Sequence, residues 1–467
     1  MSVPAGGELR RVIGFWGGTA LIIGITIGSG IFRKPGTLAA NLPNPWVILG
    51  LWSGLGAICI FGALAVAELA SMLPKTGGSY VFLRAAYGDS SAFVFGWIYL
   101  MITAPAGVGA LAQFFAELLL GVLGYDLKLI PHWVIPTIAS GAIVVLSVAN
   151  LLGAAWGSAI QGLFTFIKVA ALCAIMLVGL FLSHGSFGHF GGGRPVELGK
   201  LGGGIAGVIW AYDGWIAVSM IAGEVVAPDK LMKRIIVFGM AAIVFLYVGA
   251  NIAYIYAMPL GQMADVKASV PQKLMSDALS PGVGTAITFC IMCSVLGALS
   301  GCVLAKPRVS YALAQDGLTF RFLGLAHPRW SSPYAAILIQ AAVAIVLVFV
   351  LNDFDVLTTY FVVVEWFALL FTVGAVIVLR KKMPDAPRPY RTPGYPWVPL
   401  LFLLGTTVGL AAIVWGEIHQ EKPNYSPLWG LLIAASGFPI FWIWKRLRPP
   451  QQFVAELSDR RPGGGPG

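Results

Sequence analysis

The sequence predicts an all-α membrane protein with about twelve transmembrane helices. Of the 467 residues, 58% are hydrophobic and only 11% are charged, and the mean hydropathy is +0.84. A soluble domain carries roughly a quarter charged residues, so this chain has too few polar groups to cover a surface that faces water. Long apolar runs separated by short loops follow one another along the chain, which leaves no room for a separate soluble domain.

Each predicted span follows from one such run, because a helix needs about 20 predominantly apolar residues to cross a bilayer. The predicted spans are 12–40, 46–73, 91–122, 131–150, 158–183, 203–226, 235–259, 285–312, 334–351, 355–380, 397–416 and 427–445. The first run resembles a signal peptide. It continues past residue 30 without a small-residue cleavage site, which favours a retained first span.

The basic residues indicate how these spans are oriented. Lys and Arg gather before span 1 and after the even-numbered spans 2, 6, 8, 10 and 12, and fewer stand in the opposite loops. Cytoplasmic loops carry such an excess, so both termini are predicted to be cytoplasmic, with the chain in the inner (plasma) membrane. The net charge of +10 is therefore explained by topology, and no nucleic-acid partner is expected.

The first span contains the strongest candidate for a working site. It reads Gly24-Ile-Thr-Ile-Gly-Ser-Gly-Ile-Phe32 and Pro35 follows, so glycines and a proline weaken the helix near mid-membrane. Unwound backbone is tolerated there only where it is buried in protein or lines a cavity. Such a break frees amide groups that suit a carboxylate and carbonyl groups that suit an ammonium group. The alternative is close helix packing through small residues.

A second interruption lies in the sixth span, at Trp210-Ala-Tyr-Asp-Gly-Trp215. Intramembrane carboxylates usually face a cavity or a partner, although Asp213 could equally be a structural acceptor for unwound backbone. Spans 1 and 6 are each the first of five consecutive spans, so the paired breaks predict an inverted-repeat transporter.

The predicted parts are a cytoplasmic N-terminus (1–11), a first five-helix repeat (12–183), a second inverted repeat (203–380), two additional helices (397–445) and a disordered cytoplasmic tail (446–467).

Lys168 stands alone in the middle of the fifth span. It is too deep to reach the interface easily, so it is predicted to point inward. There it could replace a sodium ion as a fixed cation, or it could carry a proton. Three further acidic residues lie inside predicted spans: Glu117, Glu224 and Glu365. For each of them a structural role and a functional role stay equally open. Of these, Glu365 is a candidate for lining the pathway.

No metal site, cofactor or enzyme activity is predicted. The cysteines lie inside apolar runs and are expected to be buried free thiols, since Cys290 and Cys293 have no second pair or histidine cluster to complete a zinc site. The five histidines lie in loops or at span ends and supply no catalytic cluster at membrane depth. No charged ring or filter-like motif indicates a channel.

At these residues the chain resembles the amino acid–polyamine–organocation superfamily, and within it bacterial members of the L-type amino acid transporter branch. The resemblance covers about residues 10–445. Four segments carry it: Ile27-Gly-Ser-Gly-Ile-Phe32; Ala67-Glu-Leu69 with Pro74-Lys-Thr-Gly-Gly-Ser-Tyr80 and Tyr87-Gly88; Gln161 to Lys168; and Ala211-Tyr-Asp-Gly-Trp215 with Gly223-Glu224 and Pro228. It implies a LeuT-like fold, which is a five-plus-five inverted repeat, with two extra C-terminal helices.

The resemblance also implies roles for individual residues. The amides near Ser29, Gly30 and Ile31 would hold a substrate carboxylate, and carbonyls near Thr26, Ile27, Trp210 and Asp213 would meet its ammonium group. Trp210 matches an aromatic gate, and Lys168 stands where sodium-coupled relatives bind sodium. The predicted substrate site comprises Thr26, Ile27, Gly28, Ser29, Gly30, Ile31, Trp210, Ala211, Tyr212, Asp213, Gly214 and Trp215.

The expected function is sodium-independent exchange of neutral L-amino acids by alternating access. Two alternatives stay open: proton-coupled uptake with Lys168 as the titrating group, and transport of cationic amino acids or polyamines held by Asp213 or Glu365. Animal relatives carry a cysteine between spans 3 and 4 that binds a single-span partner. The corresponding loop here, Gly124 to His132, has none, so no disulfide-linked heavy subunit is expected.

Overall fold

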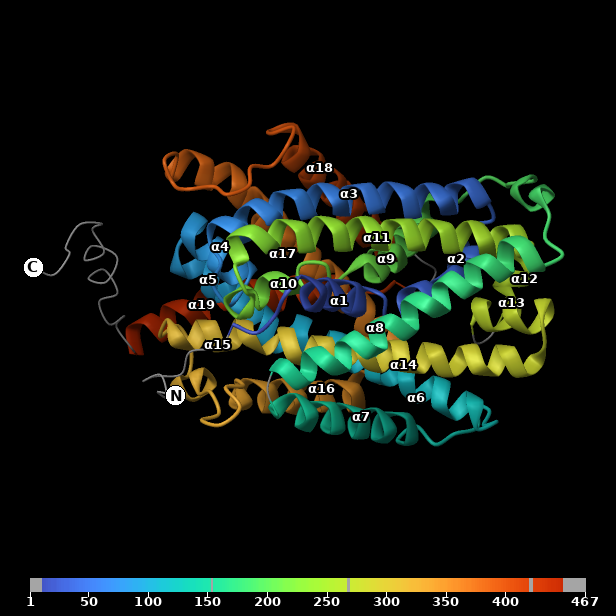
Figure 1. The fold of residues 1–467 in the computed structure, drawn as a ribbon, viewed down its shortest axis with the longest axis horizontal. Coiled ribbons are helices and arrows are strands. Elements are labelled where there is room, and N and C mark those ends of the chain that lie inside the picture. Colours follow the sequence, from blue (N-terminus) through green and yellow to red (C-terminus); the bar gives the residue numbers. More distant parts are fainter. Residues whose placement is uncertain (1–10, 153, 267–268, 420–422, 448–467) are drawn as a thin grey trace, which may run out of the picture.

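The computed structural model describes residues 11–152, 154–266, 269–419 and 423–447, and these form an all-α bundle (Figure 1). Most long helices run side by side, with α4 (Ser79–Tyr87) and α15 (Pro307–Gln315) towards one end and α12 (Leu260–Ala264) and α13 (Val270–Ala278) at the other. Residues 1–10 and 448–467, which hold most of the predicted N-terminus and tail, lie outside the described residues.

The multi-pass architecture predicted from the sequence is confirmed. Among the described residues, 11 helices are long and apolar enough to cross a membrane, and the sixth predicted span is divided into shorter pieces. In chain order the spans are α1 (Phe15–Thr26) with α2 (Gly30–Asn41); α3 (Pro45–Met72); α5 (Asp89–Ile98), η1 (Tyr99–Thr103) and α6 (Ala104–Val122); α7 (Val134–Leu151); α8 (Ala154–Leu177) with η2 (Val178–Leu182); α9 (Leu198–Tyr212) with α10 (Ala217–Met220); α11 (Pro228–Ala257); α14 (Pro281–Ala305) with α15; α16 (Tyr334–Leu351); α17 (Phe354–Lys382); α18 (Trp397–Ile418); and α19 (Ser426–Leu447).

Some helix ends differ from the predicted spans because charged residues continue a helix past the apolar run. The seventh span was predicted to begin at residue 235, whereas α11 begins at Pro228. A proline is tolerated in the first turn of a helix, because the backbone amide that it lacks would have no partner within the helix there. The eighth span is interrupted at Lys306, because Pro307 cannot continue the hydrogen-bonded ladder of α14. Three short 3-10 helices, η3 (Phe187–Phe190), η4 (Ala222–Glu224) and η5 (Arg321–Gly324), complete the described part of the fold.

The interrupted first span lies at the centre of the bundle. Residues 21–32 are all buried, and α1 packs against α8, α11 and α14. The first half of the other interrupted span, α9, packs against α2, α3 and α18. The polar backbone of both breaks is therefore enclosed by protein, as a break at membrane depth requires.

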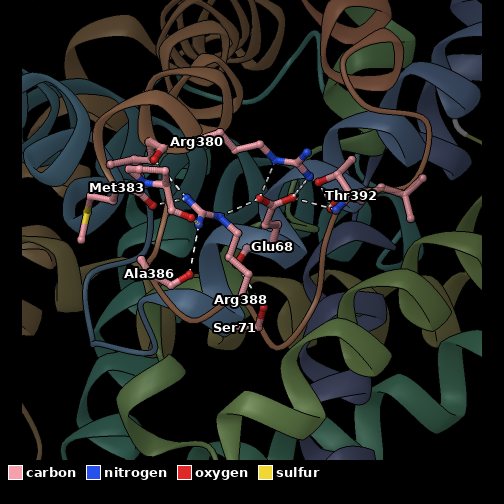
Figure 2. A network of polar contacts seen from close by, with 10 residues as sticks. Glu68, Ser71, Arg380, Met383, Ala386, Arg388 and Thr392 are labelled. Atoms are coloured by element: carbon pink, nitrogen blue, oxygen red, sulfur yellow. Dashed lines mark hydrogen bonds and ion pairs between the residues drawn. The ribbon is translucent and has the colours of Figure 1, made fainter.

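A polar network closes the end of the bundle where α3 and α17 finish (Figure 2). The carboxylate of Glu68 accepts hydrogen bonds from Arg380 Nε (3.0 Å) and Nη2 (2.7 Å) and from the amide of Thr392 (2.7 Å). Arg388 Nε lies 3.4 Å from Glu68 Oε1, and the other end of this guanidinium donates to the carbonyls of Leu379 and Met383. Glu68 on α3 thus binds residues at the end of α17 and in the loop between α17 and α18. These bonds give the Ala67-Glu-Leu69 segment a structural role.

The prediction that all cysteines are buried is wrong for three of them. Cys59 and Cys302 are buried, but Cys173 is exposed, and Cys290 and Cys293 are partly exposed. An apolar run shows that a helix crosses the membrane and does not show which of its faces points away from the bundle.

Candidate functional site

The first break has the form that a carboxylate site needs. Helix α1 ends at Thr26 and α2 begins at Gly30. The Ser29 carbonyl accepts the amides of Phe32 (3.2 Å) and Arg33 (3.0 Å). Within the described chain, the amides of Ser29, Gly30 and Ile31 have no hydrogen-bond acceptor. Free amides at the start of a helix attract anions, and the helix dipole adds to this.

The second break lies against the first. Helix α9 ends at Tyr212 and α10 begins at Ala217, and Gly214 between them has a φ of +114° that disfavours other residues. A Cβ atom at Gly214 would lie 3.0 Å from the amide nitrogen of Thr26, and one at Gly30 would lie 2.4 Å from Cα of Ala211. Both glycines therefore allow the two unwound segments to touch through their backbones.

A small cavity lies between the breaks. Part of the predicted site lines it: Thr26, Gly28, Ser29, Gly30, Trp210 and Asp213. The other predicted residues, which are Ile27, Ile31, Ala211, Tyr212, Gly214 and Trp215, lie behind the cavity wall among the described residues.

The carbonyl groups at the first break are already occupied. The Thr26 carbonyl accepts the amide of Gly28 and the hydroxyl of Tyr247, each at 2.8 Å. The Ile27 carbonyl accepts Lys168 Nζ at 2.7 Å and Ser294 Oγ at 3.0 Å. A carbonyl oxygen has two lone pairs, so neither group is free for a ligand here. Of the other residues whose carbonyls were expected to meet the ammonium group, Trp210 and Asp213 line the cavity, and Asp213 also brings an acidic side chain.

Lys168 points inward, as predicted. Its side chain is 0% exposed, and Nζ donates to the carbonyls of Gly24 (2.6 Å), Ile27 (2.7 Å) and Ser294 (2.8 Å). These acceptors belong to α1, to the break itself and to α14. The ammonium group thus binds the carbonyl end of the first half-helix, where the dipole is negative, and joins it to a neighbouring span.

Aromatic side chains close the cavity on one side. The Trp210 ring meets Phe354 and Phe361 edge-on, with centroid separations of 5.9 and 5.2 Å. Its Nε1 donates a hydrogen bond to Ser29 Oγ across 3.0 Å. We call Trp210, Phe354 and Phe361 the aromatic lid. The role of Trp210 as an aromatic gate stays a prediction, and its bond to Ser29 was not predicted.

Several cavity residues were missed by sequence reasoning: Ile25, Gly107, Leu111, Cys302, Lys306 and Phe361. Lys306 matters most, because it is a buried cation, 4% exposed, that lines the cavity. Its Nζ lies 3.5 Å from the Thr103 carbonyl and 4.3 Å from the centre of the Phe361 ring. A signal was present in the sequence, since a lysine directly before a proline near the end of an apolar run indicates an interrupted helix.

The intramembrane acids take different positions. Glu365 is 2% exposed and accepts a hydrogen bond from Tyr99 at 2.7 Å, and it lies behind the cavity. Glu117 binds Arg33 on α2, the helix that packs against α12 and α13. Glu224 forms a bidentate pair with Arg308 in which both side chains are 1% exposed. Two of these acids therefore have structural ion pairs.

The segment from Pro74 to Tyr80, which is part of the resemblance, does not line the cavity. The amide of Gly77 donates to the Met220 carbonyl (2.9 Å), and Tyr80 donates to Asp316 (2.8 Å). Thr76 fills the space beside Gly223. The segment thus holds the second half of the interrupted sixth span, next to α15.

Sequence comparison relates the chain to known proteins. A sequence model described as amino acid permease matches residues 13–438. The chain is 29% identical to the serine/threonine exchanger SteT of Bacillus subtilis over 94% of this chain and 98% of the relative. It is 27% identical to the human cystine/glutamate transporter, over 94% and 86% of the two chains, and 26% identical to the mouse b(0,+)-type amino acid transporter 1, over 94% and 88%.

Proposed function

Because the chain belongs to the amino acid permease family, we propose that it exchanges neutral L-amino acids across the membrane by alternating access, without sodium. The observation that carries this proposal is the cavity between the two breaks, which is lined by Ser29 and Gly30, whose amides have no acceptor within the described chain, and by the acidic residue Asp213. A zwitterion offers one charge to each. Relatives whose names state exchange or transport of amino acids support the same activity.

The bonds of Lys168 support sodium independence. A sodium ion prefers oxygen ligands, and the carbonyls of Gly24, Ile27 and Ser294 converge on one point. The lysine ammonium occupies that point and satisfies all of them. A fixed cation of this kind needs no ion from solution, and its full set of acceptors favours a role as a permanent charge over a role as a proton carrier.

The position of Lys306 bears on the substrate side chain. Its ammonium group lines the cavity with one long hydrogen bond, to Thr103. A cationic substrate would meet this charge, which opposes transport of arginine or polyamines even though Asp213 is near. A substrate with a side-chain oxygen would give Lys306 an acceptor. We therefore place small polar amino acids such as serine and threonine first among the neutral substrates.

The test is exchange by the purified protein in liposomes. Vesicles loaded with unlabelled serine should take up labelled serine, alanine or leucine, whereas empty vesicles should not. If no amino acid exchanges against itself, the proposed function is wrong. Uptake into empty vesicles that depends on an imposed pH gradient would instead establish proton coupling, and uptake of arginine by the unmodified protein would establish cationic transport.

We further propose that both termini are cytoplasmic, that the protein lies in the plasma membrane and that it works without a disulfide-linked partner subunit. The distribution of Lys and Arg supports the orientation. The loop from Gly124 to His132 holds no cysteine that could form such a link. Thiol labelling of single cysteines placed at Gly124 and at Ala386 from each side of the membrane tests the orientation, with label reaching Gly124 from outside.

A further inference from the structure

A surface of cations and aromatic rings lies on the outside of the bundle, where the chain enters the first span. The segment before α1 runs alongside the segment before α11. The amides of Val12 and Ile13 donate to the Glu224 carbonyl, at 2.9 and 3.0 Å, and the amide of Val226 donates to the Ile13 carbonyl at 2.9 Å. Helix α1 then packs against α11. Residues far apart in the sequence therefore meet on one face of the protein.

Aromatic side chains cover the junction of these two helices. The ring centre of Phe15 lies 5.0 Å from that of Trp16 and 6.0 Å from that of Phe238 on α11. Trp16 and Phe238 are exposed, and so is Phe245, two turns further along α11. Membrane proteins place exposed tryptophan at the level of the lipid head groups. The rings thus mark the edge of the bilayer, and an apolar strip continues from them along α11.

Three cations stand at the outer edge of the same surface. Lys230 and Arg234 precede Phe238 by eight and four residues on α11, so they share its face. Arg11 comes directly before the paired segment, and all three cations are exposed. Within the described ranges none of them has an ion-pair partner. Asp229, the neighbouring acid, offsets one of these charges at most, so the surface is positive.

We propose that this surface binds an acidic phospholipid of the inner leaflet. The anionic head group pairs with the cations, and an acyl chain lies along Phe238 and Phe245. The orientation proposed above places this end of α11 at the cytoplasmic face, where the leaflet carries acidic lipids. We call this site the cationic–aromatic surface, and its members are Arg11, Phe15, Trp16, Lys230, Arg234 and Phe238.

The combination of charges and rings distinguishes an acidic lipid from other ligands. A soluble phosphate compound would pair with the cations and leave the rings exposed. A zwitterionic lipid would cover the rings but would bring its own cation close to Arg234. An acidic lipid satisfies both parts. Because α1 and α11 each contribute to the surface, the bound lipid also joins the start of the interrupted first span to an uninterrupted helix.

The experiment counts bound lipid and needs no transport, so its outcome is separate from that of the proposed function. The purified full-length protein in detergent is incubated with phosphatidylglycerol or phosphatidylcholine of the same acyl chains, and native mass spectrometry measures what is retained. The parent should retain phosphatidylglycerol in preference. Arg234→Gln and Arg11→Gln should each weaken this retention about fivefold. Arg234→Lys should preserve it, and Phe238→Ala should weaken it although no charge is lost.

The matched control is Lys381→Gln, which removes an exposed cation from the last turn of α17. It lies at the same end of the bundle, since the loop after α17 places the Tyr390 ring 6.0 Å from Lys233 Nζ on α11. Its retention of phosphatidylglycerol should equal that of the parent. Glycerol 3-phosphate, which has no acyl chains, should not compete.

Four results would overturn the proposal. They are equal retention of the two lipids by the parent, unchanged retention in both arginine-to-glutamine variants, an equal loss in Lys381→Gln, and competition by glycerol 3-phosphate. The first would leave only apolar contact with the bilayer, and the third would leave only the general attraction of a positive end for acidic lipid. The fourth would assign the cations to a soluble phosphate compound.

Discussion

The indole nitrogen of Trp210 donates its hydrogen bond to the hydroxyl of Ser29, so a side chain of the second break binds a side chain of the first. Ser29 is 1% exposed and Trp210 is 8% exposed, and both line the central cavity. The bond fixes the lid residue relative to the free amides of α2. Ser29 therefore has two separable parts: a backbone amide that can meet the substrate, and a hydroxyl that orients Trp210.

Ser29→Ala should reduce exchange without abolishing it. The amides of Ser29, Gly30 and Ile31 stay in place, whereas the indole N–H loses its acceptor, which costs about 1–3 kcal/mol for a buried donor. Trp210→Phe removes the same bond from the other side. If the hydrogen bond is the shared cause, the double variant should be no worse than Trp210→Phe alone. Additive losses in serine exchange would show that the two side chains act independently.

Gly30→Ala should cost more transport than Ser29→Ala. The added Cβ would lie 2.4 Å from backbone Cα of Ala211, and backbone cannot rotate away as a side chain can. Overpacking of this kind costs about 1–3 kcal/mol or more and would separate the two breaks. The control is Gly141→Ala on α7, where an added Cβ meets nothing within 4 Å. Normal exchange by Gly30→Ala together with complete loss in Ser29→Ala would refute the backbone role of α2.

The spans and both helix breaks could be predicted because each depends on local sequence. Apolar length sets a span, and clustered glycines beside a proline or an aspartate weaken a helix wherever it packs. The position of Lys168 followed for the same reason, since a charge in mid-membrane has no route to water. These features can be predicted without knowing which helices are neighbours in the fold.

The cavity residues that come from other spans could not be predicted, because their positions depend on packing between spans that are distant in the sequence. Gly107 and Phe361 lie on apolar stretches that resemble any other lining of a bundle. The partners of the Thr26 and Ile27 carbonyls come from α11, α8 and α14, so sequence reasoning assigned these carbonyls to the substrate. Lys306 is the exception, because its charge beside Pro307 was visible in the sequence.

Lys168→Met should abolish exchange while the protein still reaches the membrane. The change removes the donor that the Gly24, Ile27 and Ser294 carbonyls share, although Ser294 Oγ still donates to the Ile27 carbonyl. It also removes the positive charge at the end of α1. Exchange by the unmodified protein should be the same in sodium and choline buffers. Lys273→Met serves as the control for loss of a lysine. A parent activity that requires sodium would contradict the fixed-cation role.

The buried pair between Glu224 and Arg308 should contribute to folding stability in a way that an exposed pair does not. Both side chains are 1% exposed, and the pair joins the end of the interrupted sixth span to α15. Glu224→Met leaves a buried guanidinium without its partner, which is expected to cost about 3–5 kcal/mol. The double change to Glu224→Met and Arg308→Met should recover part of that loss, because no unpaired charge remains.

Thermal unfolding of the detergent-solubilised protein measures this difference. The exposed Lys273–Asp277 pair is the reference, and Asp277→Asn should change the free energy of unfolding by no more than about 1 kcal/mol. The order expected is parent and Asp277→Asn as the most stable, the double variant next and Glu224→Met last. If the double variant is less stable than Glu224→Met, Arg308 has a stabilising role of its own. Its bond to the Leu304 carbonyl is then the contact to test, because it ties α15 back to α14 across the interruption at Lys306 and Pro307.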